Sequence, residues 1–223
     1  MAKVHGFPGE WARVNGVVMG LWPLFVWIFV GGFALAMFCF FSAALGAIGL
    51  VMAVAWIIWN LRLGLKKVES FFKGAKGEER VAAILQDLPD DCQIFHDYVA
   101  GKDHIDHVAV TPSGIYAIET KFWSGKVTLE DGRILVDGKL PARSPVGQAL
   151  READEIRNKL RAMGWTGYIT PVVAFASDTF DGNQAELKGV TILNSSVLKA
   201  YLMAHPSILT QLELDRIVKL MEE

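Results

Sequence analysis

The sequence predicts a mixed α/β domain, with a central sheet flanked by helices, preceded by two transmembrane helices. Two observations support this fold class. An uncharged apolar run extends from Val14 to Leu61, which is long enough for two membrane spans. The rest of the chain alternates short runs rich in β-branched and aromatic residues, typical of strands, with segments of helical periodicity.

The apolar run is the most distinctive segment of the chain, because it contains no Asp, Glu, Lys or Arg. A helix needs about 20 apolar residues to cross a bilayer, so the run fits two crossings better than one. We place them near 17–38 and 43–60. A cleaved signal peptide is several times shorter. A single span with a re-entrant segment is the alternative interpretation.

Basic residues flank the apolar run on both sides. Lys3 and Arg13 precede it, and Arg62 and several lysines follow it. The positive-inside rule then places both flanks in the cytosol, as a helical hairpin in the inner or cytoplasmic membrane requires. We therefore predict a multi-pass membrane anchor at 1–61, a linker helix at 62–73 and a cytosolic domain at 74–223, with both termini in the cytosol.

The domain after the linker shows a clear succession of elements. Gly74 and Gly77 are expected to break the linker helix, and a new helix is expected from Glu78 to Pro89. Strands are expected at 93–99, 104–111, 115–122, 169–175 and 190–193, a small hairpin at 126–130 and 133–137, and helices at 145–163, 195–205 and 209–221.

The charge of the domain limits the kinds of partner it can bind. Residues 62–223 carry 20 Lys and Arg against 23 Asp and Glu, whereas domains that bind nucleic acid non-specifically are usually basic. This balance argues against tight, general binding of nucleic acid, although a local basic groove is compatible with it. The two cysteines, Cys39 and Cys92, have neither a disulfide nor a metal-binding spacing, which fits a reducing cytosol.

Three charged residues fall on two neighbouring predicted strands. Asp106 lies near the start of the first strand. Glu119 and Lys121 lie near the end of the second, and their spacing of two places both side chains on one face. A hairpin turn centred on Ser113 would set Asp106 opposite Thr120, between the other two.

Charged groups on an apolar strand pair are costly unless they pair with each other or hold a metal. Two carboxylates are hard oxygen ligands suited to Mg²⁺, and a neighbouring lysine can orient a water or stabilise charge at phosphorus. These residue types in this arrangement suit phosphodiester cleavage. From the residues alone, a salt bridge between Glu119 and Lys121 on an exposed face is the other interpretation.

Motifs around these residues occur in a fixed order along the chain. They are GAKGE at 74–78, IDHV at 105–108, GIYAIETK at 114–121, WSG at 123–125, and the start of the long helix at 145–153 with Gln148. Together they resemble the nuclease-related domain (NERD) family, which is part of the PD-(D/E)xK, restriction-endonuclease-like group. The resemblance spans roughly residues 74–175.

The resemblance implies a restriction-endonuclease-like fold and a role for each matching residue. Asp106 and Glu119 would bind the metal, Mg²⁺ with Mn²⁺ as an alternative, and Lys121 would be the catalytic lysine. Gln148 would be a supporting polar group, and Glu78 an additional acidic residue, with Glu79 as an alternative.

Other polar residues near this constellation are expected to have no part in it. His107 should point to the opposite face of its strand from Asp106. His96 and Asp97 are interpreted as surface residues at a strand end. Glu152 lies among alternating charges on the long helix, a pattern typical of a solvated face.

Three hypotheses follow from the sequence. In the first, the chain is a membrane-anchored, Mg²⁺-dependent nuclease, a hydrolase acting on DNA in preference to RNA at the cytosolic face. In the second, it is a non-catalytic, nuclease-like binding or scaffold module tethered to the lipid bilayer. In the third, the membrane hairpin itself is the functional part.

Overall fold

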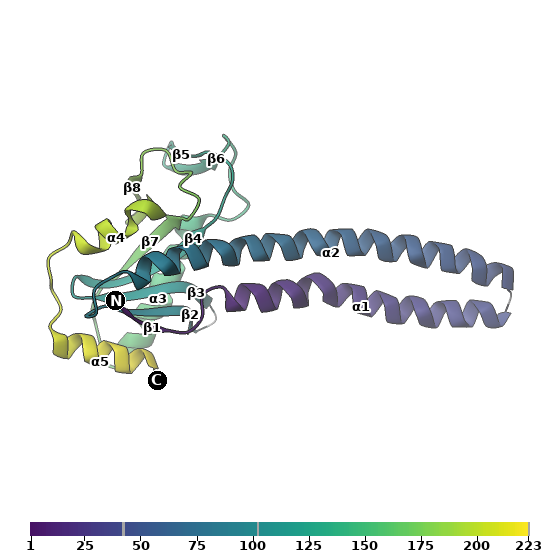
Figure 1. The fold of residues 1–223 in the computed structure, drawn as a ribbon, viewed down its shortest axis with the longest axis horizontal. Helices are drawn as coiled ribbons and strands as arrows, with labels where there is room; N and C mark the ends of the chain where they lie inside the picture. Colours follow the sequence, from purple (N-terminus) through teal and green to yellow (C-terminus); the bar gives the residue numbers. More distant parts are fainter. Residues whose placement is uncertain (42, 102, 223) are drawn as a thin grey trace. The chain divides into compact units, whose positions relative to one another are not determined.

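The computed structural model describes residues 1–41, 43–101 and 103–222 (Figure 1). Two compact units divide the chain: Met1–Gly9 with Lys76–Glu223, and Glu10–Ala75. The predicted fold class is confirmed, because a seven-stranded mixed sheet flanked by helices accompanies two N-terminal helices long and apolar enough to span a membrane.

The Glu10–Ala75 unit is built from two long helices, α1 (Glu10–Phe41) and the larger part of α2 (Ala43–Gln86). At about 1.5 Å per residue, each exceeds the roughly 30 Å of a bilayer core. The rest of the described chain buries neither apolar stretch. Large unburied apolar surfaces of this kind are typical of helices that contact lipid.

Glycines bring α1 and α2 close together within this unit. A Cβ atom on Gly64 would overlap the carbonyl oxygen of Gly20. One on Gly16 would lie 2.5 Å from Cβ of Phe71. Gly16 and Gly20 have the G-x-x-x-G spacing that allows two helix backbones to approach. The two helices therefore pack through small residues.

The central sheet belongs to the other unit and contains seven strands. In spatial order they are β1 (Lys3–His5), β2 (Gln93–Ala100), β3 (Asp103–Thr111), β4 (Gly114–Lys121), β7 (Ile169–Phe175), β9 (Val190–Asn194) and β8 (Gln184–Leu187). The strands β2, β3 and β4 form an antiparallel meander, β7 and β9 continue the sheet parallel to β4, and β8 is antiparallel to β9. A separate hairpin joins β5 (Val127–Glu130) to β6 (Arg133–Val136).

The edge strands β1 and β8 were not predicted from the sequence. They have three and four residues, and neither carries the run of apolar residues that marks a buried strand. Each strand exists because a longer neighbour offers it hydrogen bonds, which is a tertiary effect rather than a local preference.

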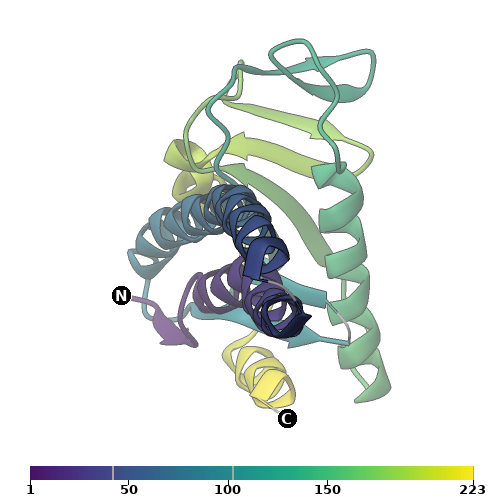
Figure 2. The ribbon, with the colours of Figure 1, turned by 90° about the vertical axis from the view of Figure 1, so that its right-hand side faces the viewer.

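Helices cover both faces of the sheet. Figure 2 shows α3 (Pro145–Ala162, green) along one face. On that face, the core includes Ile156 and Leu160 of α3, Val108 and Ile115 of the sheet, and Ile217 of α5 (Gln211–Glu222). The core of the opposite face includes Val81 and Leu85 of α2, Ile94 and Ile118 of the sheet, and Leu198 of α4 (Ser195–Met203).

The predicted helix break at Gly74 and Gly77 is wrong, because α2 runs without interruption from Ala43 to Gln86. A glycine inside a helix costs only about 1 kcal/mol relative to alanine, so a long packed helix can accommodate two. Gly77 also has a packing reason. A Cβ atom there would lie 2.6 Å from Cβ of Phe122, directly after β4.

The first nine residues pack with the domain. The N–H of Lys3 donates to the carbonyl of Cys92 at 3.1 Å, and β1 pairs in parallel with β2. The His5 ring stacks on Phe95 with 4.5 Å between centroids, and its Nε2 lies 3.0 Å from Oε1 of Gln93. The start of the predicted anchor therefore covers the outer edge of the sheet.

Candidate functional site

Asp106 lies where the ladder between β3 and β4 ends. The last pair is His107 with Ile118, so the register differs by one residue from the predicted one. The reason is the turn: Thr111 pairs directly with Gly114, which leaves two residues in the turn instead of three. The carboxylate nevertheless meets the expected residue, because Oδ2 of Asp106 accepts a 2.7 Å hydrogen bond from the N–H of Thr120.

Glu119 and Lys121 form an ion pair at the end of β4. Glu119 is only 1% exposed, and Lys121 is mostly buried. The interpretation of this pair as a salt bridge on an exposed face is therefore wrong. The pairing strands and α3 enclose it, because β4 lies in the middle of the sheet between β3 and β7.

Gln148 reaches the ion pair from the second turn of α3. Ser144 caps this helix, accepting a 3.2 Å hydrogen bond from the N–H of Gly147, and so sets where its first turn lies. Nζ of Lys121 donates to Oε1 of Gln148 at 3.1 Å. The structure thus brings Gln148 together with Lys121 and Glu119.

Glu152 is a site residue that the sequence reasoning missed. Nε2 of Gln148 donates to its Oε1 at 3.0 Å, and the side chain is 1% exposed. Its assignment to a solvated face is wrong, although Asp154 and Arg157 do form an exposed pair on this helix. The sequence feature that could have identified Glu152 is its position four residues after Gln148, which puts both side chains on one face of the helix.

Glu78 enters from α2 on the other side of the sheet. It is buried, whereas the alternative, Glu79, is exposed. The pKa of Glu78 is raised to about 7 by burial and by the charges of Asp97 and Glu119, while a backbone hydrogen bond with Gly9 acts in the opposite direction. The electrostatic interaction with Glu119 shows that Glu78 belongs to the same cluster.

The cluster contains more carboxyl groups than one lysine can balance. Burial raises the pKa of Asp106 well above its usual range, and the charges of Glu119 and Glu78 raise it further. Burial and Glu119 raise the pKa of Glu152 to about 10. Burial lowers the pKa of Lys121, but Glu119 and Asp106 outweigh this and raise it. These shifts show that the site is short of positive charge.

Three buried carboxyl oxygens have no hydrogen-bond partner among the described residues: Oε2 of Glu78, Oε2 of Glu119 and Oε2 of Glu152. Hard oxygen donors without partners are the kind of ligand that Mg²⁺ takes, and Glu119 is one of the two predicted metal ligands. No three acidic, histidine or cysteine side chains in the described part of the chain are already arranged around a metal position. A cation held by two carboxylates, with water or substrate oxygens as its other ligands, is compatible with both facts.

A pair of histidines lies beside the cluster on β2 and β3. Nδ1 of His96 and Nδ1 of His107 are 2.7 Å apart, and both rings are buried. The prediction of His96 as a surface residue is wrong, because β1 covers the outer edge of β2. Burial lowers the pKa of His96 to about 4 and the pKa of His107 well below its usual range, so both are neutral at pH 7.

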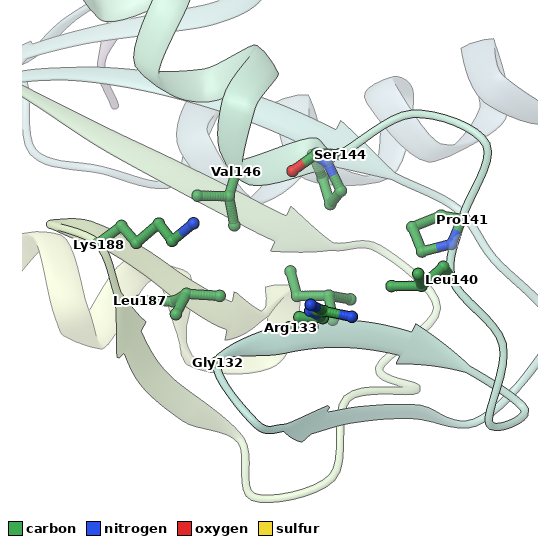
Figure 3. A pocket seen from close by; sticks show the side chains of 10 residues that line it. Gly132, Arg133, Leu140, Pro141, Ser144, Val146, Leu187 and Lys188 are labelled. Atoms are coloured by element: carbon green, nitrogen blue, oxygen red, sulfur yellow. The ribbon is translucent and has the colours of Figure 1, made fainter.

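A cavity of about 250 Å³ lies elsewhere, between the β5–β6 hairpin, the start of α3 and the turn from β8 to β9 (Figure 3). Apolar side chains such as Leu140 and Leu187 line it together with Arg133 and Lys188. None of the predicted site residues lines this cavity. We place the candidate chemistry at the carboxyl cluster, because the buried charges and unpartnered oxygens are there.

Residues 73–176 match the family model of the nuclease-related domain, NERD. The match spans every predicted site residue, from Glu78 to Gln148, and includes Glu152. It confirms the resemblance drawn from the motifs. No curated protein and no solved structure matches the chain.

Proposed function

Since residues 73–176 carry a nuclease-related domain, we propose that this chain is a membrane-anchored, Mg²⁺-dependent nuclease that hydrolyses phosphodiester bonds at the cytosolic face of the membrane. The resemblance to the family favours DNA over RNA as substrate. One observation carries the proposal: Asp106, Glu119 and Lys121, matched to the family by motif, meet in one buried cluster that is short of positive charge.

In this proposal, Asp106 and Glu119 hold the metal, with Mn²⁺ able to replace Mg²⁺. When bound, the cation activates a water molecule and neutralises charge on the phosphate. Lys121 adds a fixed positive charge beside the carboxylates, where it stabilises the negative charge that develops on the phosphate oxygens. Gln148 holds this ammonium group from α3. Glu78 contributes further negative charge from α2.

The course of the chain supports the proposed hairpin. It leaves the domain unit after Gly9 and returns to it at Lys76, so a membrane between these points must be crossed an even number of times. Two helices have the length and composition for two crossings. Basic residues on both flanks favour the cytosolic side of an inner or cytoplasmic membrane for the domain and both termini.

A non-catalytic scaffold is the second candidate function. Two observations favour it: residues 62–223 are acidic, and no three metal-binding side chains are pre-arranged among the described residues. In that case the buried carboxyl cluster would be a remnant of a nuclease fold.

The test uses the purified full-length chain in detergent micelles, with single- and double-stranded DNA and RNA as substrates. We expect cleavage in Mg²⁺ or Mn²⁺ and none with a chelator. Lys121→Ala should lower the rate by about 100-fold or more. Lys126→Ala, which removes an exposed lysine paired with Asp181, is the matched control and should cleave like the wild type.

Equal cleavage by Lys121→Ala and the wild type would show that a contaminant is responsible. If the wild type cleaves none of the substrates and calorimetry detects no heat from Mg²⁺ or Mn²⁺, the scaffold is favoured.

A further inference from the structure

Glu152 stands out on the buried face of α3. The buried residues of this helix are Pro145, Val146, Ala149, Glu152, Ala153, Ile156 and Leu160. Only Glu152 among them is ionisable. A buried carboxyl group stabilises a helix–sheet interface less than an apolar side chain of similar size would. The reason for a buried glutamate at this position therefore lies in the contacts that Glu152 makes.

Those contacts link Glu152 to the candidate lysine through Gln148. Nζ of Lys121 donates to Oε1 of Gln148 at 3.1 Å, and Nε2 of Gln148 donates to Oε1 of Glu152 at 3.0 Å. The carboxyl groups of Glu152 and Glu119 also interact, and Glu119 accepts from Lys121. Two residues of β4 and two of α3 thus form a chain of hydrogen bonds that runs from Glu119 through Lys121 and Gln148 to Glu152.

The amide of Gln148 can make both of its hydrogen bonds in this chain in one orientation only. Its oxygen accepts and its nitrogen donates, so rotating the amide by half a turn would point N–H groups at the ammonium of Lys121. Glu152 offers an acceptor on the side where the nitrogen lies, and so favours the orientation that places the oxygen toward Lys121. Lys121 favours the same orientation, because its ammonium can only donate, and Glu152 adds the acceptor for the amide nitrogen.

We propose that Glu152 is a positioning residue: it orients the amide of Gln148, which in turn holds the ammonium of Lys121 beside Glu119. Nothing in the motif match assigns Glu152 a role. The consequence for cleavage rests on the proposed nuclease function, whereas the orientation of Gln148 does not depend on it.

The experiment compares Glu152→Ala, Glu152→Gln, Gln148→Ala and the double variant Glu152→Ala/Gln148→Ala, in the full-length chain in detergent micelles. Asp154→Asn, on the exposed face of the same helix, is the matched control. We expect Glu152→Ala to lower kcat about 10- to 100-fold with little change in KM, as the loss of a supporting hydrogen bond typically does. Glu152→Gln should recover most of this loss, because its amide oxygen still accepts from Gln148.

The double variant tests whether Glu152 acts through Gln148. In the Gln148→Ala background, adding Glu152→Ala should have no further effect on kcat, because the two residues then form one coupled unit. Multiplying losses in the double variant would overturn the proposal. So would a Glu152→Gln variant as impaired as Glu152→Ala, since that result would make Glu152 a charged ligand.

A measurement that does not depend on cleavage can test the positioning role of Glu152 separately from the nuclease function. With ¹⁵N-labelled glutamine, the side-chain amide resonances that disappear in Gln148→Ala identify Gln148. They should shift in Glu152→Ala, return toward the wild-type position in Glu152→Gln, and stay in place in Asp154→Asn. If the wild type cleaves no substrate but these shifts occur, the nuclease function fails and the positioning role stands. Unchanged resonances in Glu152→Ala would refute the positioning role even in an active enzyme.

Discussion

The N–H of Thr120 donates a 2.7 Å hydrogen bond to Oδ2 of Asp106, although the ladder between their strands ends one pair earlier. This bond fastens the Asp106 carboxyl to β4, between Glu119 and Lys121. Burial and neighbouring carboxylates raise the pKa of Asp106 well above its usual range, which means that they disfavour its charged form. The hydrogen bond from Thr120 holds the carboxyl group in place despite this environment. Position and charge at residue 106 can therefore be tested separately.

Asp106→Asn should keep the hydrogen bond and remove the charge, because an asparagine oxygen accepts from Thr120 as well. We expect it to lose metal binding and cleavage while the metal-free chain stays at least as stable as the wild type at pH 8. Asp106→Ala leaves the N–H of Thr120 without this acceptor and should be about 1–3 kcal/mol less stable than Asp106→Asn. Urea unfolding in micelles measures the difference, and equal stability of the two variants would contradict the role of this bond.

The stability of the metal-free chain should fall as the pH rises above 7. Glu152 has a pKa of about 10 in the fold against an ordinary 4.5, so between these values the folded chain holds a proton that the unfolded chain has lost. One such proton lowers the free energy of unfolding by about 1.4 kcal/mol per pH unit. The histidines contribute little in this range, because His96 and His107 are neutral in the fold and, with an ordinary pKa of 6.5, mostly neutral in the unfolded chain.

Urea unfolding at pH 7, 8 and 9 measures this slope, and Glu152→Gln is the control that should reduce it by about 1.4 kcal/mol per pH unit, since Asp106 keeps its own raised pKa. Adding Mn²⁺ should also reduce it, because a cation replaces protons on the carboxyl groups. Calorimetric titrations of Mn²⁺ in buffers with different heats of ionisation should then detect released protons. A slope that is identical in the wild type and Glu152→Gln would count against the raised pKa.

Two glycines of α2 should respond to alanine with opposite signs. A Cβ atom on Gly77 would lie 2.6 Å from Cβ of Phe122, so Gly77→Ala must push the part of α2 that carries Glu78 away from β4. A Cβ atom on Gly74 meets nothing within 4 Å, so Gly74→Ala should stabilise the helix by up to about 1 kcal/mol. Thermal unfolding of both variants in micelles checks this, and stabilisation by Gly77→Ala would show that the close approach does not matter.

The N-terminal strand should contribute to the stability of the domain although it precedes the membrane helices. His5→Ala removes the stack on Phe95 and the contact with Gln93, and should cost about 1–2 kcal/mol. Lys3→Ala, in the same strand, removes an exposed side chain but keeps the backbone bonds of β1, so it should be nearly neutral. Chemical unfolding compares the two, and equal effects would mean that the side chain of His5 does not hold β1.

The elements that the sequence predicted well are those with a strong local pattern. The strands β2, β3, β4, β7 and β9 carry apolar runs, and α3 has apolar residues at helical spacing. The continuity of α2 could not be predicted, because the packing of Gly77 against Phe122 involves residues far apart in sequence. The edge strands β1 and β8 depend in the same way on the neighbours with which they pair.

The same distinction between local sequence pattern and tertiary packing applies to the residues of the candidate site. Asp106, Glu119 and Lys121 could be found because they lie on adjacent strands joined by a short turn, where sequence spacing sets spatial distance. The choice between Glu78 and Glu79 and the importance of Glu152 depend on which face of a helix meets the sheet.

The amino-acid sequence alone was enough to establish an apolar segment with two candidate spans, a mixed α/β domain and the motif of a nuclease-related family. These are local properties, set by composition and by short-range periodicity. Only the tertiary structure decided that Gln148 and Glu152 join Lys121 and Glu119 in one chain of hydrogen bonds. Burial removes water from these groups, and a carboxyl group's pKa and partners then depend on residues that no local pattern brings together.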